Sequence, residues 1–364
     1  LYQGLLRSTA SWARVGRGYV GALLEMGVPV AAVELRGFRY DPSFALPEKL
    51  QLFSAEEARQ RPPPELGLGC VHPPYLSRLL GQRKYNLFVW EADRVPKKWC
   101  ELLQTGVDQV VVPSRFTRDA LTAGGFPRER VLEIPLGYAR SQVERALQWR
   151  QESDTRFTFF TVAAPHWRKG PRELLLGYRA AFSRADPVRL RIKTSYDPGA
   201  ARRRFPFEIP SWKQLLSDCG LKEPDAPPVE LIFTSLSDDE LLNLYSAAHV
   251  YVAPTWGESF GLAILEAMAM ARPVITTGWG GHLEFLPSDW ELLPYTLQEG
   301  GEALYEPTPG AQVAVPQVDP LRDQLRWHFE NRGLSRELGL QARQWVASMT
   351  WQNAAERLQA ALLT

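Results

Sequence analysis

Residues 251–277 read YVAPTWGESFGLAILEAMAMARPVITT. An apolar run, a glycine-containing loop, a run with helical spacing and a β-branched run follow one another, which predicts strand, loop, helix and strand. Gly257 and Gly261 bracket Glu258 in the loop, and glycine lets a ligand approach the backbone closely. The predicted helix begins near Phe260, where unpaired amides and the positive end of the helix dipole suit a phosphate.

Glu266 is unusual in this predicted helix, because its neighbours from Leu262 to Met270 are otherwise apolar. A helix that is apolar all round is buried, and a buried carboxylate without partners is costly. One interpretation pairs Glu266 with a buried Arg or Lys and leaves Glu258 facing water. In the other, both carboxylates hold one extended, hydroxyl-rich ligand, since eight helical residues span at most about 12 Å. The glycine bracket, the helix start and the following strand favour the second interpretation.

Strand and helix patterns alternate along the whole chain, which predicts an α/β protein with parallel sheets covered by helices. The predicted strands are residues 28–35, 66–71, 86–90, 109–112, 131–134, 157–162, 188–193, 229–233, 250–252 and 273–276. The polar stretch 141–155 separates two halves, so we expect Rossmann-like domains over 1–145 and 155–345. We expect the two domains to face each other across a cleft and to bind a ligand at the carboxyl ends of their strands. Residues 306–320 are predicted to be a loop.

Composition limits the class of protein. The chain has 364 residues, of which 45% are hydrophobic and 23% charged, enough for two folded domains. A net charge of +1 offers no global field for nucleic acid, and three widely spaced cysteines form neither a disulfide framework nor a metal pattern. No apolar run reaches the roughly 20 residues that span a bilayer, and no secretory leader pattern opens the chain. We therefore expect a cytoplasmic protein with at most peripheral contact at the inner face of the membrane.

Several motifs together resemble glycosyltransferase family 4. Glu258 and Glu266, with seven residues between them, are similar to the Glu-x7-Glu signature of that family. Further landmarks follow the order of the family along most of the chain: Val112-Pro113-Ser114-Arg115-Phe116-Thr117, Ile134-Pro135-Leu136-Gly137, Arg168-Lys169-Gly170, Gly280-Gly281-His282-Leu283-Glu284-Phe285-Leu286 and Thr350-Trp351. The resemblance implies a retaining, nucleotide-sugar-dependent enzyme of the GT-B fold. Its second domain would bind the nucleotide sugar, its first domain would bind the acceptor, and a C-terminal helix at about 350–364 would cross back onto the first domain.

The resemblance also implies roles for the two acids. Glu258 would contact hydroxyls of the donor sugar, and Glu266 would contact hydroxyls of the ribose. The segment between them would present its amides to the phosphate and the sugar, and so adds four donor-binding residues: Ser259, Phe260, Gly261 and Leu262.

A cationic site should meet the diphosphate of the donor. Lys169 follows the first strand of the second domain and is well placed for this role. For an isolated Arg-Lys pair, two solvated charges at a turn would be the commoner explanation, but the matched context favours the functional one. The family usually has an Arg about five positions before this Lys, where the chain has Ala164. Either Arg168 or Lys193 would substitute for it.

The first domain departs further from the pattern of the family. The Gly-rich loop of the family corresponds to residues 8–16, in which Gly16 is the candidate donor contact. A His that often ends a later strand is missing from the segment Trp90-Glu91-Ala92-Asp93-Arg94-Val95-Pro96, so Glu91 and His72 are the candidates for an active-site group. A lone His is more often structural than catalytic. Tyr138 and Ala139 replace the Asp that usually follows Ile-Pro-Leu-Gly.

The resemblance therefore implies transfer of a hexose-type sugar, with retention, from a UDP- or GDP-sugar to a hydroxyl of a glycan, lipid-linked or small-molecule acceptor. No Asp-x-Asp motif occurs in the chain, so we expect no metal and no cofactor besides the donor substrate. The alternative is a non-catalytic GT-B homologue that binds a sugar nucleotide or a partner protein. An epimerase or phosphorylase is a third interpretation, although the additional acid/base set of an epimerase is not identifiable. The basic cluster 201–206 is either a solvated loop or a patch for membrane phosphates or an anionic acceptor.

Overall fold

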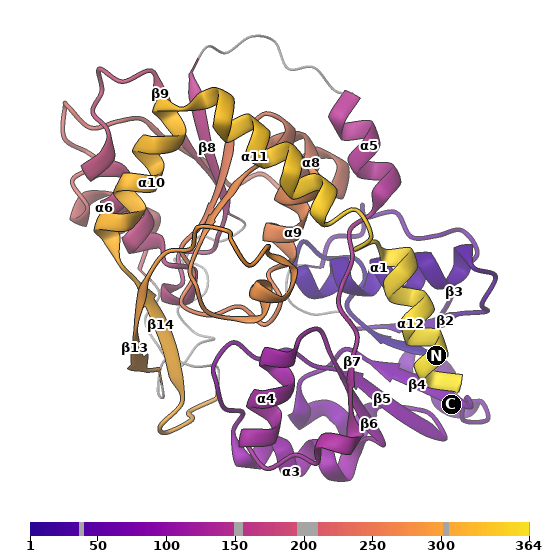
Figure 1. Ribbon diagram of the computed structural model, residues 1–364. Coiled ribbons are helices and arrows are strands. Elements are labelled where there is room, and N and C mark those ends of the chain that lie inside the picture. Colours follow the sequence, from indigo (N-terminus) through magenta and orange to yellow (C-terminus); the bar gives the residue numbers. More distant parts are fainter. Residues whose placement is uncertain (36–39, 149–155, 195–209, 301–305, 364) are drawn as a thin grey trace. The chain divides into compact units, whose positions relative to one another are not determined.

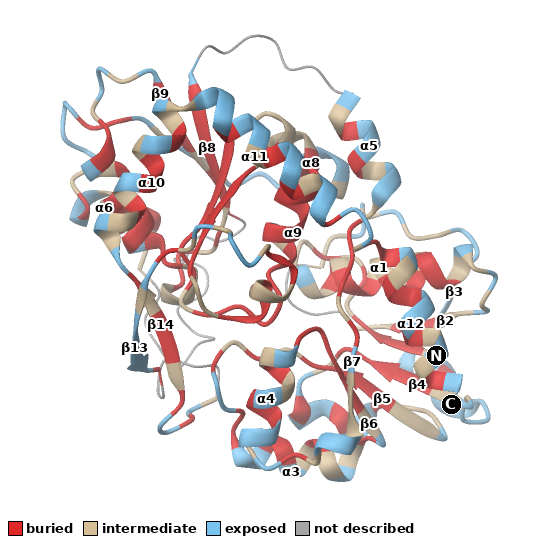
Figure 2. Ribbon diagram, in the orientation of Figure 1, coloured by how far each residue is buried: buried red, intermediate tan, exposed pale blue. Residues whose placement is uncertain are grey.

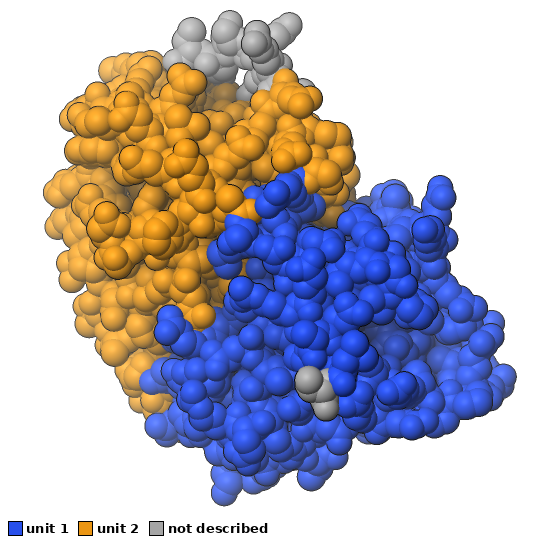
Figure 3. Space-filling model, turned by 45° about the vertical axis from the view of Figure 1, so that its right-hand side comes forward, with its two compact units in different colours: residues 1–140, 348–364 blue, residues 141–347 orange. Residues whose placement is uncertain are grey.

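The computed structural model describes residues 1–35, 40–148, 156–194, 210–300 and 306–363 (Figure 1). The chain divides into unit 1, with residues 1–140 and 348–364, and unit 2, with residues 141–347 (Figure 3). The basic cluster 201–206 lies outside the described residues. Among the residues that are described, none of the helices has both the length and the apolar character needed to cross a bilayer.

Unit 1 is built on a parallel 7-stranded sheet with the order β3-β2-β1-β4-β5-β6-β7. Its elements are β1 (Tyr2–Gly4), α1 (Ser11–Glu25), β2 (Ala31–Glu34), β3 (Gln51–Phe53), α2 (Ala55–Gln60), β4 (Leu66–Gly69), η1 (Pro73–Arg78), β5 (Arg83–Leu87), α3 (Lys97–Gly106), β6 (Gln109–Val112), α4 (Arg115–Ala123), η2 (Arg128–Arg130), β7 (Val131–Glu133) and α12 (Trp351–Leu363). The strand order reverses between β1 and β4, which is where open α/β sheets bind ligands.

The C-terminal helix α12 belongs to unit 1 and packs on α1 (Figure 1). The Trp351 ring lies 5.3 Å from the Tyr19 ring, edge to face. Gly18 makes room for this indole, because a Cβ on Gly18 would lie 2.2 Å from it. Upstream of α12, the Tyr138 amide donates to the Met349 carbonyl at 3.0 Å. The expected return of the C-terminal helix to the first domain is confirmed.

Unit 2 is built on a parallel 5-stranded sheet with the order β10-β9-β8-β11-β12, and it carries a separate antiparallel hairpin, β13-β14. Its elements are α5 (Arg140–Gln148), β8 (Phe157–Val162), η3 (Trp167–Lys169), α6 (Pro171–Ala181), β9 (Val188–Lys193), α7 (Trp212–Asp218), β10 (Val229–Ile232), α8 (Asp238–Ser246), β11 (Val250–Ala253), α9 (Leu262–Ala269), β12 (Val274–Thr276), η5 (Gly281–Phe285), β13 (Tyr295–Glu299), β14 (Gln312–Pro316), α10 (Val318–Glu330) and α11 (Arg332–Trp345). The predicted class, an α/β protein with two Rossmann-like sheets, is confirmed.

Helix α9 has the buried character that its composition predicts (Figure 2). Its N-cap is Gly261 at φ 82°, a left-handed conformation that glycine adopts without strain. The helix therefore begins at Leu262, slightly later than the predicted start near Phe260. The chain turns at Gly261 so that the apolar helix enters the core while the preceding loop stays at the carboxyl end of β11.

Some local expectations are wrong. Residues 306–320 are not a loop, because β14 and the start of α10 lie in this range. The strand pairs with β13, and a local pattern rich in proline does not reveal such pairing. The polar stretch 141–155, predicted only as the boundary between the two halves, also contains most of α5, whose buried side chains are only Val143 and Ala146. A helix with so few apolar contacts has a weak sequence signal.

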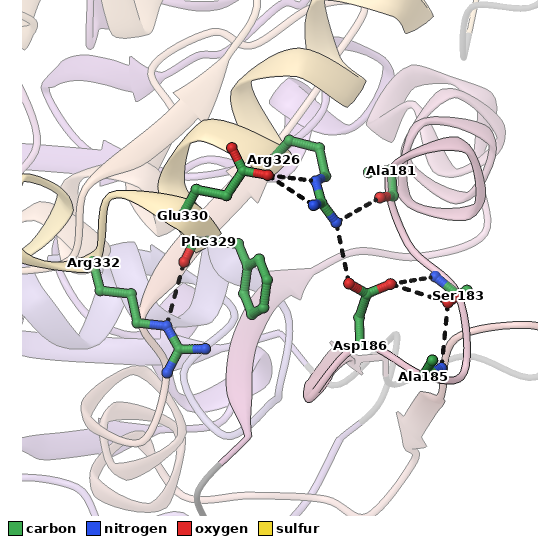
Figure 4. Close-up of polar contacts among 8 residues, drawn as sticks. All are labelled: Ala181, Ser183, Ala185, Asp186, Arg326, Phe329, Glu330 and Arg332. Carbon is green, nitrogen blue, oxygen red and sulfur yellow. Dashed lines mark hydrogen bonds and ion pairs between the residues drawn. The ribbon is translucent and has the colours of Figure 1, made fainter.

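Ion pairs and hydrogen bonds connect α10 to the turn between α6 and β9 (Figure 4). Arg326 bonds to Asp186 at 3.1 Å and to Glu330 at 2.7 Å. Asp186 in turn accepts from the Ser183 amide at 2.9 Å. The side chain of Arg326 is 36% exposed, so this network fixes the orientation of the helix more than it adds stability.

Candidate functional site

Two loops of unit 2 meet at the carboxyl end of its sheet. One follows β8 and the other follows β11, and these strands are neighbours on either side of the point where the strand order reverses. The Trp256 amide donates to the Arg168 carbonyl at 2.8 Å. Gly170, at φ 60°, approaches so closely that a Cβ there would lie 1.8 Å from the Pro254 carbonyl. The two loops therefore form one structural feature.

The side chains of these loops bring together three of the predicted site residues. The Lys169 ammonium group bonds to Oε1 of Glu258. Nη1 of Arg168 lies 3.6 Å from the same oxygen and donates to the Gly257 carbonyl at 3.0 Å. Glu258 is buried at 9% exposure. Two cations against one carboxylate leave this cluster with one net positive charge, which suits an anionic ligand.

The electrostatics keep this cluster charged. Burial alone would raise the pKa of Glu258, but the charges of Lys169 and Arg168 outweigh it and hold the pKa below its usual value. The pKa of the neighbouring His166 is also lowered, to about 3, because burial and then the same two cations disfavour its charged form. His166 is therefore neutral, and its Nδ1 accepts from the Arg168 amide at 3.1 Å. An ionised Glu258 can accept hydrogen bonds from hydroxyl groups.

The loop that continues from Glu258 presents backbone amides. Within the described part of the chain, the amides of Phe260, Gly261 and Leu262 have no backbone carbonyl acceptor. Ser259 is buried beside them at 4% exposure, and the Phe260 ring packs on Phe285 at 5.0 Å. Amides at the start of a helix bind anions and polar oxygens. The four predicted donor-binding residues of this segment thus lie at one helix start.

Glu266 is buried within α9 at 4% exposure. The Tyr245 hydroxyl on α8 donates to its Oε2 at 3.4 Å. Burial raises the pKa of Tyr251, and the charges of Glu258 and Glu266 both raise it further. Both carboxylates therefore act electrostatically on the same tyrosine of β11.

The two candidates for the missing arginine differ in position. Arg168 adjoins Glu258, as described above. Lys193 ends β9, and its ammonium group donates to the Thr194 carbonyl at 2.9 Å. Arg168 is therefore the candidate that the structure places in the cationic cluster.

The remaining candidates lie in unit 1. His72 precedes η1, and burial lowers its pKa while the charge of Glu91 opposes this shift, so the two groups interact. The His72 ring lies 5.8 Å from Trp99 and 6.1 Å from Trp12. Gly16 lies inside α1 and not in a loop, because the helix begins at Ser11, so the expected loop at 8–16 is wrong. Its lack of a side chain admits the Tyr2 hydroxyl, which would lie 2.4 Å from a Cβ there.

His282 is a polar residue of this site to which the sequence pattern gave no role. Its side chain is fully buried in η5, and its Nε2 lies 2.8 Å from the Thr277 carbonyl. The amide of the preceding Gly281 donates to the Glu258 carbonyl at 2.7 Å. In the sequence, His282 follows two glycines shortly after a predicted strand. An apolar residue would be enough for packing at this position, so a histidine there could have been taken as a candidate site residue.

Comparison with known proteins bears on this arrangement. The family model described as glycosyl transferases group 1 matches residues 216–294, which contain Glu258 and Glu266. A D-inositol 3-phosphate glycosyltransferase from Corynebacterium diphtheriae is 28% identical over 194 residues, 52% of this chain and 38% of that enzyme. The sulfoquinovosyl transferase SQD2 of Arabidopsis thaliana is 28% identical over 128 residues, 35% of this chain and 22% of that enzyme. The matches span between 18% and 38% of the length of such curated relatives.

Solved structures match over nearly the whole chain. Sucrose-phosphate synthase from Thermosynechococcus elongatus has a TM-score of 0.69 at 17% identity and covers 100% of this chain and 98% of that one. Anabaena Alr3699/HepE in complex with UDP has a TM-score of 0.66 at 11% identity, covering 99% and 98%. The comparisons show a GT-B fold and sequence similarity to glycosyltransferases. The segment matched by the family model includes the loop and helix of the carboxylates, whereas the cations at 168–169 precede it.

Proposed function

We propose that this chain is a retaining glycosyltransferase of the family 4 type, which transfers a hexose from a UDP- or GDP-sugar to a hydroxyl group. The observation that carries the proposal is the buried, ionised Glu258 between Arg168 and Lys169, beside amides at the start of α9 that have no backbone acceptor among the described residues. A nucleotide sugar has the complementary chemistry, since it combines hydroxyl groups with a diphosphate. Seven residues separate Glu258 from Glu266, and this spacing supports the assignment to glycosyltransferase family 4.

Each group has a defined role in the proposed reaction. Glu258 accepts hydrogen bonds from hydroxyls of the transferred sugar and so orients the anomeric carbon. Lys169 and Arg168 stabilise the negative charge that develops on the departing nucleoside diphosphate, the kind of electrostatic stabilisation that dominates many enzymes. Glu266 holds the ribose hydroxyls. Unit 1 supplies the acceptor site, with Glu91 and His72 as its candidate polar groups.

The bond changes balance without a further reagent. The bond from the anomeric carbon to the diphosphate oxygen breaks, and a bond from the same carbon to the acceptor oxygen forms on the same face of the sugar. The proton of the acceptor hydroxyl passes to the departing phosphate oxygen. The two cations perform the charge stabilisation, so we propose that no metal and no cofactor besides the donor is needed.

The comparisons guide the choice of substrates to test. One solved neighbour is titled as a complex with UDP and glucose, and another as a complex with UDP-glucose. The curated relatives are named for glycosyl transfer to D-inositol 3-phosphate and for sulfoquinovosyl transfer. UDP-sugars are therefore the first donors to test, with glycan, lipid-linked and small-molecule hydroxyls as acceptors. A cytoplasmic location with at most peripheral membrane contact belongs to the same proposal.

Release of nucleoside diphosphate from UDP- and GDP-sugars, with and without acceptors, tests the proposal. We expect one donor to turn over faster when an acceptor is present and to keep turning over in excess EDTA. A bound donor at 100 times its dissociation constant should also add about 2.7 kcal/mol of stability in a thermal-shift assay. NMR of the product should show retained anomeric configuration. Stabilisation by a donor with no turnover under any condition would contradict catalysis and favour a non-catalytic sugar-nucleotide binder.

A further inference from the structure

His282 lies next to the loop that carries Glu258, since the amide of the preceding Gly281 donates to the Glu258 carbonyl. Its ring is fully buried, and its Nε2 lies 2.8 Å from the Thr277 carbonyl and 3.2 Å from Oγ1 of Thr276. Thr276 itself donates to the Ala253 carbonyl at 3.0 Å, across to the end of β11. These bonds fix the imidazole at the carboxyl ends of β11 and β12.

The partners determine the tautomer of this histidine. A carbonyl oxygen can only accept, so Nε2 must carry the hydrogen, and the hydroxyl hydrogen of Thr276 is already used at Ala253. Nδ1 therefore carries a lone pair, and among the described residues it has no hydrogen-bond partner. Burial lowers the pKa of His282, which keeps the ring neutral. A buried polar ring with one unsatisfied atom costs stability that an apolar side chain would not cost.

Gly280 lies close to both the His282 ring and the backbone of Glu258. A Cβ placed on Gly280 would lie 3.3 Å from Nδ1 of His282, and 3.0 Å and 3.2 Å from the carbonyl oxygen and the nitrogen of Glu258. On the other side, a Cβ on Gly261 would lie 3.0 Å from Cβ of His282. The imidazole is thus flanked by two glycines that leave space beside the Glu258 backbone.

We propose that His282 is a positioning residue for Glu258. Its Nε2 hydrogen bond holds the turn of Gly280 and Gly281 against the ends of β11 and β12, and the Gly281 amide holds the Glu258 carbonyl at 2.7 Å. The carboxylate is thereby fixed where the hydroxyl groups of the transferred sugar must dock. This inference rests on the proposed function, because it assumes that Glu258 binds the sugar of the donor.

Two substitutions whose side chains have similar length distinguish a positioning role of His282 from simple filling of space. In His282→Gln, the side-chain amide can donate to Thr277 from nearly the place of Nε2, whereas Met in His282→Met fills the space without a donor. We expect His282→Met to lower kcat with UDP-glucose, or with the GDP-sugar that the donor screen selects, by about 10- to 100-fold. We expect His282→Gln to retain roughly a third or more of wild-type kcat, because its side-chain amide keeps the hydrogen-bond donor to Thr277. Equal losses in both variants, or none in His282→Met, would overturn the inference.

A double-mutant cycle tests whether His282 acts through Glu258. If it does, adding His282→Met to Glu258→Gln should change kcat by less than about 3-fold, because the positioned group is already disabled. The binding constant for the nucleoside diphosphate alone, measured calorimetrically, should stay near the wild-type value in His282→Met. The same fold-loss in both backgrounds would show an independent, structural effect. Wild-type activity of Glu258→Gln itself would instead remove the proposed function, so the two failures are distinguishable.

Discussion

The Lys169 ammonium group bonds to Oε1 of Glu258, 89 residues further along the chain. The bond joins the loop after β8 to the loop after β11, and Arg168 adds a second cation 3.6 Å from the same oxygen. Contacts within the protein hold the cluster together, so a donor would meet fixed charges and little reorganisation would be needed.

Loss of either partner should abolish most of the transfer activity. We expect Glu258→Gln and Lys169→Ala each to lower kcat/KM by at least about 100-fold, because each removes a group that stabilises charge or orients the sugar. Circular dichroism should show an intact fold. Matched controls are Glu291→Gln and Lys213→Ala, both exposed in the same unit, and near-wild-type activity is expected for them. Wild-type turnover in either site variant would contradict the assigned role.

The pH profile should depend on Arg168. The cations hold the pKa of Glu258 below its usual value, so the carboxylate stays ionised at neutral pH and loses its charge only as the pH falls through this lowered pKa. We expect Arg168→Gln to shift the acid limb of kcat/KM to higher pH, because one of the two cations is gone. Profiles of both proteins between pH 4 and 8 provide the measurement. An unchanged acid limb would mean that another group governs it.

Gly280 should not tolerate a side chain. Its φ of 125° disfavours L-residues, and a Cβ there would press on the Glu258 backbone at 3.0 Å and 3.2 Å. We expect Gly280→Ala to lower kcat by about 10-fold or more while the protein still folds, since small displacements of a binding group are costly in rate. Gly333→Ala is the control, because a Cβ there would meet nothing within 4 Å, and it should be silent. Equal activity of the two variants would contradict the geometry.

Tyr245 should matter to donor affinity through Glu266. Tyr245→Phe removes the hydroxyl that donates to Glu266 at 3.4 Å, so the carboxylate is less well held for the ribose. We expect a rise in donor KM of about 3- to 10-fold with little change in kcat, in line with one lost hydrogen bond. Tyr178→Phe removes a comparable buried bond to the Pro228 carbonyl and should lower stability without changing KM. A KM change shared by both variants would point to a general effect of destabilisation.

The sequence predicted best where elements are long or strongly patterned. The strands β6, β8 and β9 have their predicted bounds. The three-residue strands β1 and β3 were not predicted, whereas β7 and β12, equally short, were. The hairpin strand β14 depends on pairing with β13, which local composition does not show.

The candidate site was also predicted only in part from the sequence. Glu258 and Lys169 were predicted from their motifs together with the family resemblance, and both follow strands whose carboxyl ends meet. The start of α9 was predicted near Phe260, close to its observed start at Leu262. That Arg168 adjoins Glu258, and that the Lys193 ammonium group donates to the Thr194 carbonyl, depends on side-chain directions that no spacing reveals. The role of His282 depends on its partner Thr277 and on its packing between glycines, which only the folded structure shows.

A structure of the complex with the intact donor selected by the activity screen tests the central claim most directly. We predict an oxygen of Glu258 at about 3 Å from a hydroxyl of the sugar, with Lys169 and Arg168 at similar distances from the diphosphate oxygens. A donor bound elsewhere, with Glu258 still paired only to its two cations, would contradict the account.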